Sequence, residues 1–267
     1  MNEKIRKVFL DENIEFFGAV SYGECRVISE NIESRLPFAP ESAILYLVPY
    51  YYGDADNLSA YAVSRDYHLY MKECRERIIS HLKAIYPENS FVGFADHSPI
   101  DERYAAAAIG LGMIGDNRLL INEKYGTYVF IGEIFTDLSP EPLGAVTSGK
   151  IKFCEHCGKC KDVCPAGCLR GEGVCLSEIT QRKGQLSEDE VLLMRQVNTV
   201  WGCDVCQRAC PHNAGISVTP IEFFKKDRIP RLTSEILSNM SDEEFARRAY
   251  SWRKRKTIER NLKLLEY

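Results

Sequence analysis

Two cysteine-rich stretches decide how this chain folds: CEHCGKCKDVCP, Cys154–Pro165, and CDVCQRACP, Cys203–Pro211. The first stretch spaces its thiols as C-x2-C-x2-C-x3-C followed by proline, and the second repeats the shorter form C-x2-C-x3-C followed by proline. Of the 11 cysteines, only Cys25 and Cys74 lie outside residues 154–210. This concentration indicates metal binding, because the disulfide scaffolds of secreted proteins distribute their cysteines through the whole fold.

The first stretch has the spacing of bacterial ferredoxins, in which the fourth cysteine of the run binds a different 4Fe-4S cluster from the first three. We therefore predict two 4Fe-4S clusters, each built from both stretches. The ligands of the first cluster are Cys154, Cys157, Cys160 and Cys210. The second cluster takes Cys164, Cys203, Cys206 and one further cysteine from the segment between the stretches.

The eighth ligand is either Cys175 or Cys168. We favour Cys175, because the glycine-rich residues 171–173 leave the backbone free to turn toward the cluster. Cys168 lies four residues after Cys164, on what we expect to be the same short helix. Zinc is the alternative metal, since paired C-x2-C motifs commonly form zinc sites. Three-cysteine runs that end in Cys-Pro, present twice, favour iron–sulfur clusters instead.

The composition is that of a globular protein with a sizeable core. The chain has 267 residues, 45% of them hydrophobic, and a formal net charge of -4, which gives no general attraction to DNA or to a membrane surface. No apolar run approaches the roughly 20 residues that a bilayer span requires, and the amphipathic N-terminus lacks a signal-peptide pattern. We therefore expect a cytoplasmic protein, in which Cys25 and Cys74 are buried as small apolar side chains.

The pattern before the cysteines mixes helices and strands without strict alternation, which predicts an α+β fold. Apolar runs predict strands at residues 44–52, 91–95 and 128–135. Helices are expected at residues 59–86, with Ser59 as the N-cap, and at residues 103–111.

Three domains follow from this organisation. Residues 1–140 form a layered α+β domain, and residues 150–218 form a ferredoxin-like domain with two 4Fe-4S clusters. The two are joined by a linker that contains prolines and glycines. Residues 219–267 form a C-terminal helical tail, in which Ser241 caps a helix that carries acids in its first turn.

Four motifs together resemble the epoxyqueuosine reductase family, which is related to the reductive dehalogenases. They are ADHSPIDERYAAAAIGLGMIGDNRLLINEKYGTYVFIGEI at residues 95–134, Asp66-Tyr67-His68, WGCDVCQRACPHN at residues 201–213, and SDEEFARRAYSWRKRKTIERNL at residues 241–262. The G-x-G-x-x-G within the first motif follows a helix and not a strand, so it does not match a dinucleotide fingerprint. The resemblance extends over nearly the whole chain, and the combination of motifs makes it specific.

The resemblance implies a cobalamin without a protein axial ligand, held by the N-terminal domain and supplied with electrons by the two clusters. It implies as substrate the epoxide of a modified tRNA nucleoside, whose oxygen leaves as water. The family's acid motif D-x-x-P-x-x-E-R corresponds here to Asp96, Pro99, Glu102 and Arg103. Asp96, with its pKa raised by burial against the corrin, would donate a proton to the departing oxygen. An ordinary turn residue is the alternative for Asp96.

Further residues are implied to line the cobalamin: Asp66, Tyr67, His68, Arg103, Gly110, Gly112, Asn117 and Leu120. Each has a simpler alternative. The first three would form an ordinary helix face, Arg103 would pair with Glu102, and the glycines would only end a helix.

Departures from the family concern the substrate more than the cofactors. Members of the family continue into helical repeats that help to hold tRNA, whereas this sequence ends at Tyr267, and Met113 and Asp116 stand where aromatic and basic residues are usual. The tail from Ser241 carries eight Lys or Arg against five acids, which suits phosphate contacts or a solvated face.

The implied partners are tRNA and an electron donor of the ferredoxin or flavodoxin type, with neither DNA nor a membrane. Two other functions are weighed against the reductase: a 4Fe-4S electron-transfer protein without cobalamin, and a zinc-stabilised interaction module.

Overall fold

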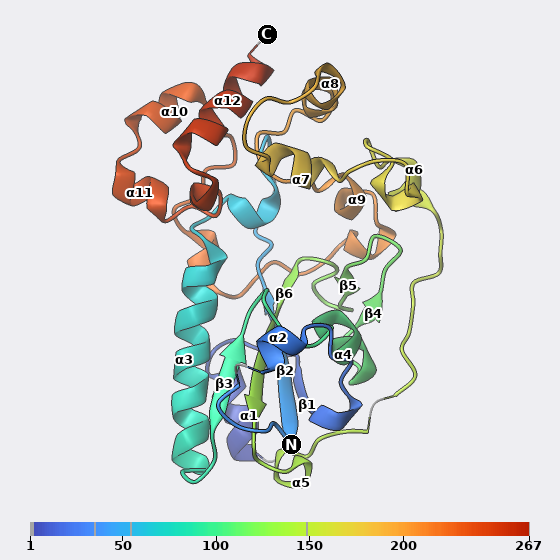
Figure 1. The fold of residues 1–267 in the computed structure, drawn as a ribbon, viewed down its shortest axis with the longest axis vertical. Coiled ribbons are helices and arrows are strands. Elements are labelled where there is room, and N and C mark those ends of the chain that lie inside the picture. Colours follow the sequence, from blue (N-terminus) through green and yellow to red (C-terminus); the bar gives the residue numbers. More distant parts are fainter. Residues whose placement is uncertain (1–2, 35, 54, 148, 267) are drawn as a thin grey trace. The chain divides into compact units, whose positions relative to one another are not determined.

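The computed structural model describes residues 3–34, 36–53, 55–147 and 149–266, which form two compact units (Figure 1). The first unit consists of Met1–Pro49 and Tyr70–His156, and the second of Tyr50–Leu69 and Cys157–Tyr267. Among the described residues, no helix combines the length and the apolar character needed to cross a bilayer.

An antiparallel four-stranded sheet forms the centre of the first unit, in the order β1-β2-β6-β3 (Figure 1). The strands are β1 Phe17–Ser21, β2 Ser42–Pro49, β3 Phe91–Phe94 and β6 Val129–Thr136. A separate hairpin pairs β4 Met113–Ile114 with β5 Leu120–Ile121. The apolar run at residues 44–52 becomes β2, which is buried along its whole length because strands pair with it on both sides. The predicted α+β class is confirmed.

Helices cover both faces of this sheet. Successive side chains of a strand point to opposite faces, so the apolar strands present side chains that need cover on each face. Helix α4, Glu102–Ala108, packs against the face that contains Leu45 of β2 and Phe135 of β6. On the other face the ring of Tyr46 lies 5.7 Å from that of Phe9 in α1. The unit also contains α1 Glu3–Leu10, α2 Glu30–Glu33, α5 Pro140–Leu143 and most of α3 Tyr67–Ile85.

The two isolated cysteines lie in this unit. Cys74 on α3 is fully buried, as expected, whereas Cys25 is half-buried and directs its thiol to the carbonyl of Ser21. Burial raises the pKa of each thiol to about 12. Both side chains are therefore neutral at physiological pH, as small apolar residues would be.

The predicted start of the long helix at Ser59 is wrong, because α3 begins at Tyr67. A short 3-10 helix, η2 Ala60–Ala62, occupies the residues after Ser59. The Ser59 hydroxyl donates to the carboxylate of Asp204 and caps no helix, and the N–H of Ala60 donates to the same carboxylate at 2.6 Å. Asp204 lies 145 residues away in the sequence, so no local pattern predicts this contact.

The second unit is helical and has its core around Trp201 and Tyr250, both fully buried. Residues 50–69 belong to it because, for example, the N–H of Val200 donates to the carbonyl of Asn57 at 2.7 Å. Ser241 begins α11 with a capping box, as predicted. The helices are α6 Lys159–Asp162, α7 Leu176–Gln181, α8 Glu188–Val197, α9 Val205–Arg208, α10 Ser234–Asn239, α11 Asp242–Ala246 and α12 Arg255–Leu265.

Candidate functional site

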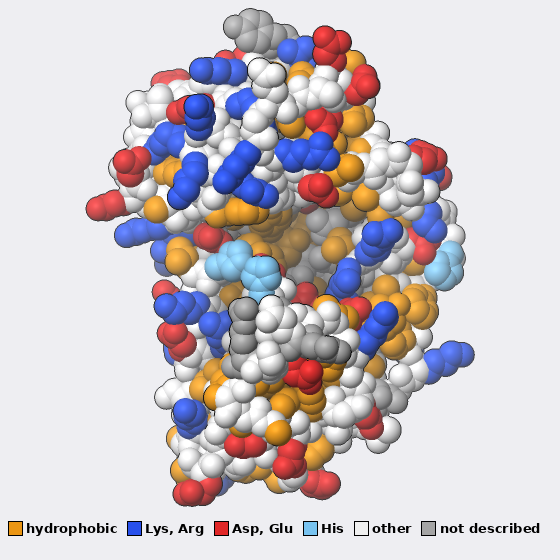
Figure 2. Space-filling model, in the orientation of Figure 1, with side chains coloured by type: hydrophobic (Ala, Val, Ile, Leu, Met, Phe, Trp, Pro, Cys, Tyr) orange, Lys and Arg blue, Asp and Glu red, His pale blue; other side chains and the backbone are white. Residues whose placement is uncertain are grey.

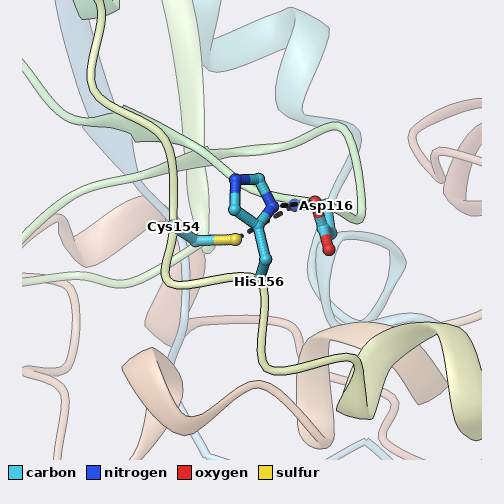
Figure 3. A group of neighbouring side chains, drawn as sticks. All are labelled: Asp116, Cys154 and His156. Carbon is cyan, nitrogen blue, oxygen red and sulfur yellow. Dashed lines mark hydrogen bonds and ion pairs between the residues drawn. The ribbon is translucent and has the colours of Figure 1, made fainter.

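Cys154, the first cysteine of the motif, lies beside the turn that joins β4 and β5 (Figure 3). The N–H of Asp116 donates to its Sγ at 3.4 Å, and a carboxylate oxygen of Asp116 lies 2.7 Å from Nδ1 of His156. One ligand atom of each of the three residues lies within 4.8 Å of the other two, so the group has the donors for a single metal ion. The N–H donor also suits a cluster thiolate at Cys154, because hydrogen bonds to ligand sulfurs help to set cluster potentials.

In the second unit, packing brings the two cysteine stretches together. Helix α6, which contains Cys160, packs against α9, which contains Cys206. Burial, together with the charges of Cys203, Asp204, Cys175 and Cys164 nearby, raises the pKa of Cys206 to about 12. The thiols around Cys206 are therefore those predicted for the second cluster.

The surroundings of the two candidate eighth ligands differ. Cys175 stands at the N-cap of α7, where its side chain makes no capping hydrogen bond, and it is among the groups that raise the pKa of Cys203 and of Cys206. Cys168 belongs to a 3-10 helix, Cys168–Arg170 (η3), and its charge raises the pKa of Cys175. This arrangement favours Cys175 as the ligand.

Asp66, Tyr67 and His68 lie together at the start of α3, within the second unit. Asp66 accepts a hydrogen bond from the N–H of His68 at 3.1 Å, and its carboxylate lies 2.8 Å from Nδ1 of the same residue. The rings of Tyr67 and His68 stack with their centroids 4.1 Å apart. His68 is exposed and Tyr67 half-buried, so this group presents a flat aromatic surface and also begins a helix.

Asp96 lies on the loop after β3, and its backbone is unusual. Its φ is +72°, and the N–H of His97 donates across it to the carbonyl of Ala95 at 3.1 Å. A positive φ costs energy in residues other than glycine, and strained turns of this kind are concentrated at functional sites. The Asp96 side chain is exposed, so the protein itself does not bury this carboxyl group. A bound cofactor would have to provide that burial.

Arg103 does not form the ion pair with Glu102 that was the simpler alternative to a cobalamin contact. Its Nη1 donates to the carbonyl of Arg118 at 2.8 Å, and its Nε lies 3.8 Å from Asp101, which is the N-cap of α4. Arg118 has a φ of +64° in the turn between β4 and β5. Arg103 therefore fixes this turn to the start of α4, and Glu102 is left to other partners.

The remaining residues implied to contact cobalamin divide into packed and accessible positions. Leu120 is buried in the core, and a Cβ on Gly112 would lie 2.5 Å from the carbonyl oxygen of Ile121, so both are explained by packing. Gly110, with a φ of +82°, faces open space. Asn117 is buried, yet its Nδ2 has no hydrogen-bond partner among the described residues. Gly110 and Gly112 also line a pocket of about 480 Å³ in this unit.

A pair of carboxyl groups near Asp96 was not predicted as a site. Glu133 on β6 is fully buried, and its Oε2 accepts a hydrogen bond from the Ser98 hydroxyl at 2.5 Å. Its Oε1 and the Oε2 of Glu102 are buried without a hydrogen-bond partner among the described residues. Burial raises the pKa of Glu102 to about 7 and that of Glu133 well above its ordinary value, and the charge of Asp96 adds to both shifts. One signal was available in the sequence, because Glu133 is the lone acid in the apolar run YVFIGEIF.

Comparison with known proteins supports the metal-binding interpretation of the cysteines. Residues 153–213 match the family described as 4Fe-4S double cluster binding domain. The prediction of a two-cluster iron–sulfur domain in this segment is confirmed.

Curated relatives match most of the chain. An epoxyqueuosine reductase of Lactococcus garvieae is 32% identical over 74% of this chain and 57% of its own length. One from Staphylococcus aureus is 31% identical over 78% of this chain and 56% of its own length. The chain thus spans a little over half the length of these relatives.

Solved structures show the same fold. The epoxyqueuosine reductase of Bacillus subtilis, with its catalytic aspartate loop swung out of the active site, has a TM-score of 0.79, 23% identity, and coverage of 98% of this chain and 80% of that one. An epoxyqueuosine reductase with a tRNA stem loop has a TM-score of 0.76, 23% identity and the same coverage. A catabolic reductive dehalogenase reaches 0.52 at 17% identity, over 96% of this chain and 37% of that one. By sequence the chain is similar to epoxyqueuosine reductases over about three quarters of its length, and it shares the fold of their solved structures.

Proposed function

We propose that this chain is a cobalamin-dependent iron–sulfur reductase, which removes the oxygen of an epoxide in a modified nucleoside of tRNA. The observation that carries the proposal is the strained, exposed Asp96, located within the family's acid motif on the same chain as a two-cluster domain. In the solved Bacillus subtilis enzyme the catalytic aspartate also belongs to a loop. We further propose a cytoplasmic protein that receives electrons from a donor of the ferredoxin or flavodoxin type.

The two clusters would be held by the cysteine sets assigned from the spacing. The first set is Cys154, Cys157, Cys160 and Cys210. The second set is Cys164, Cys175, Cys203 and Cys206. The nearness of Cys175 to Cys203 and Cys206, whose pKa values it raises, supports its choice over Cys168.

In the first unit, the buried Nδ2 of Asn117 needs an acceptor and the backbone at Gly110 is open to close approach, as a large cofactor with polar edges would require. We propose that Asn117, Gly110 and Arg103 contact the cobalamin. For Asp66, Tyr67 and His68, the resemblance supports the same role, and the rings of Tyr67 and His68 offer a stacked aromatic surface. Bound cobalamin would supply a strongly reducing centre that acts on the epoxide carbon.

The overall reaction fixes what the protein must deliver. An epoxide takes up two electrons and two protons, loses both carbon–oxygen bonds, and yields an alkene and water. Asp96 would donate a proton to the departing oxygen, which otherwise leaves as an unstable alkoxide. An exposed carboxyl can reach a substrate, and substrate binding would bury it and raise its pKa as donation requires.

A basic surface on the second unit supports tRNA as the partner. Figure 2 shows Lys and Arg side chains gathered over α10, α11 and α12, and four exposed bases of the tail are Arg247, Lys254, Lys256 and Lys263. The other bases of the tail include structural ones. Arg255, for example, donates to the carbonyls of Leu237 and Met240. Phosphate contacts would use the exposed group.

The test begins with anaerobic purification and metal analysis. About eight irons per chain are expected for two cubane clusters, and zinc in their place would remove the proposal. Cys175→Ser should reduce the iron content toward one cluster, whereas Cys168→Ser, as its control, should leave the content unchanged. The opposite result would assign the eighth ligand to Cys168.

Activity then separates the reductase from a simple electron carrier. The chain should bind cobalamin and restore queuosine to the tRNA of a strain that lacks the reductase. Asp96→Asn should keep clusters and cobalamin but lower turnover by at least roughly 100-fold. A chain that holds both clusters but no cobalamin would be an electron-transfer protein.

A further inference from the structure

Glu102 and Glu133 form a buried carboxyl pair that is suited to hold one proton. Oε2 of Glu102 and Oε1 of Glu133 are both buried, and neither has a hydrogen-bond partner among the described residues. The two groups are neighbours, because each acts on the pKa of the other and α4, which begins at Glu102, packs on the strand that contains Glu133. Two carboxylates cannot hydrogen-bond to each other unless one of them carries a proton. A proton shared between them would supply the partner that both oxygens lack.

The fold keeps this pair out of water and in place. Glu133 lies opposite Leu45 of β2 and Phe94 of β3 in the sheet register, on the face that α4 covers. Glu102 is the first residue of α4. The Ser98 hydroxyl donates to Glu133 and accepts the N–H of Ile100, so it ties the pair to the loop that carries Asp96.

Other charged and titratable groups around the pair leave it without a direct cationic partner. Asp96, Asp101 and Arg103 act on Glu102, and the guanidinium of Arg103 is directed to the Arg118 carbonyl. From the residues after β1, Tyr22 and Cys25 lie near Glu133, and burial keeps both neutral. With no direct ion pair to hold both charges, the pair retains its proton near neutral pH.

We infer that Glu102 and Glu133 share one proton and return it to Asp96 after each donation, so that they act through Asp96 and do not touch the substrate. This inference rests on the proposed function, whose reaction consumes two protons although Asp96 holds one. In the step, the O–H bond of the pair breaks, Asp96 carboxylate becomes the acid again, and the pair regains its proton from solvent. No electrons move, so the step needs no oxidant or reductant.

Infrared spectroscopy tests the shared proton without any turnover. In protein labelled with ¹³C-glutamate, a protonated-carboxyl band should persist to about pH 7 and then titrate. Glu102→Gln should abolish the band, because its amide can donate to Glu133 but holds no transferable proton. Glu133→Gln is the second variant, and exposed Glu88→Gln is the matched control that should keep the band. Absence of the band in the unmodified protein above about pH 5 would overturn the inference, since ordinary glutamates are ionised there.

Turnover of the cobalamin-loaded protein tests the relay. Glu102→Gln should bind clusters and cobalamin normally, lower kcat by roughly tenfold or more, and remove the limb of the pH profile near pH 7. An unchanged kcat and pH profile would overturn the relay.

Asp96→Asn distinguishes the two proposals, because it should keep the infrared band while it loses turnover. If that variant turned over normally, the role of Asp96 in the proposed function would fail, and with it the relay, whereas the band would still report the shared proton.

Discussion

Two buried acids, Asp204 in the second unit and Glu133 in the first, show that the neighbours of a carboxyl group decide its charge. Asp204 accepts hydrogen bonds from the Ser59 hydroxyl, the Ala60 N–H and the Gln207 amide. Glu133 accepts one from the Ser98 hydroxyl and otherwise faces a second carboxyl group, that of Glu102.

Burial raises the pKa of both acids, but the consequences differ. The donors around Asp204 oppose the effect of burial, whereas the charges of Glu102 and Asp96 reinforce it at Glu133. A buried carboxyl group that is surrounded by donors can stabilise the fold through its hydrogen bonds. A buried carboxyl group that faces another carboxyl must keep a proton. The first therefore joins segments of the chain, and the second is available for proton transfer.

Removal of Asp204 should have the largest effect on stability. Asp204→Ala leaves three buried donors without an acceptor, and we expect the free energy of unfolding to fall by about 3 kcal/mol. Urea unfolding of anaerobic protein, followed by circular dichroism, measures this loss. Asp204→Asn keeps one acceptor oxygen, so its free energy of unfolding should lie between those of the unmodified protein and the alanine variant. An alanine variant as stable as the unmodified protein would contradict the structural role of Asp204.

The carboxyl pair should make stability fall as pH rises. The folded protein keeps the proton of Glu102 up to about pH 7, whereas the unfolded chain releases it near pH 4.5. Between these values the folded state binds more protons, so up to about 3 kcal/mol is lost across the window and no more above it. Glu102→Gln should lack this loss, as urea unfolding of both proteins across the window would reveal. Parallel pH dependences would contradict the shifted pKa.

Removal of the Ser98 hydroxyl, which donates to Glu133, should have the smallest effect on stability. Ser98→Ala should cost about 1 kcal/mol of unfolding free energy. Because the Ser98 hydrogen bond lowers the pKa of Glu133, its loss should move the titration of the pair to higher pH. The midpoint of the infrared carboxyl band measures this shift. A midpoint that moved to lower pH would mean that Ser98 does not stabilise the charged form.

The sequence predicted the elements whose pattern is local. The apolar runs gave β2 and β6 within a few residues, and Ser241 gave the start of α11. The helix expected from Ser59 failed because a distant carboxylate, Asp204, takes the hydroxyl that would have capped it. An ion pair with Glu102 was the simpler alternative to a cobalamin contact for Arg103, but its guanidinium instead donates to a backbone carbonyl in the adjacent turn.

The sequence by itself determined the metal chemistry of this protein, because the ligands of iron–sulfur clusters follow a spacing that a few residues of chain geometry impose. It also placed Asp96 within a motif. Only the tertiary structure set Glu133 against Glu102, since they meet through the packing of α4 on the sheet. Burial and hydrogen-bond partners are properties of the folded chain, and they decide which acid holds a proton.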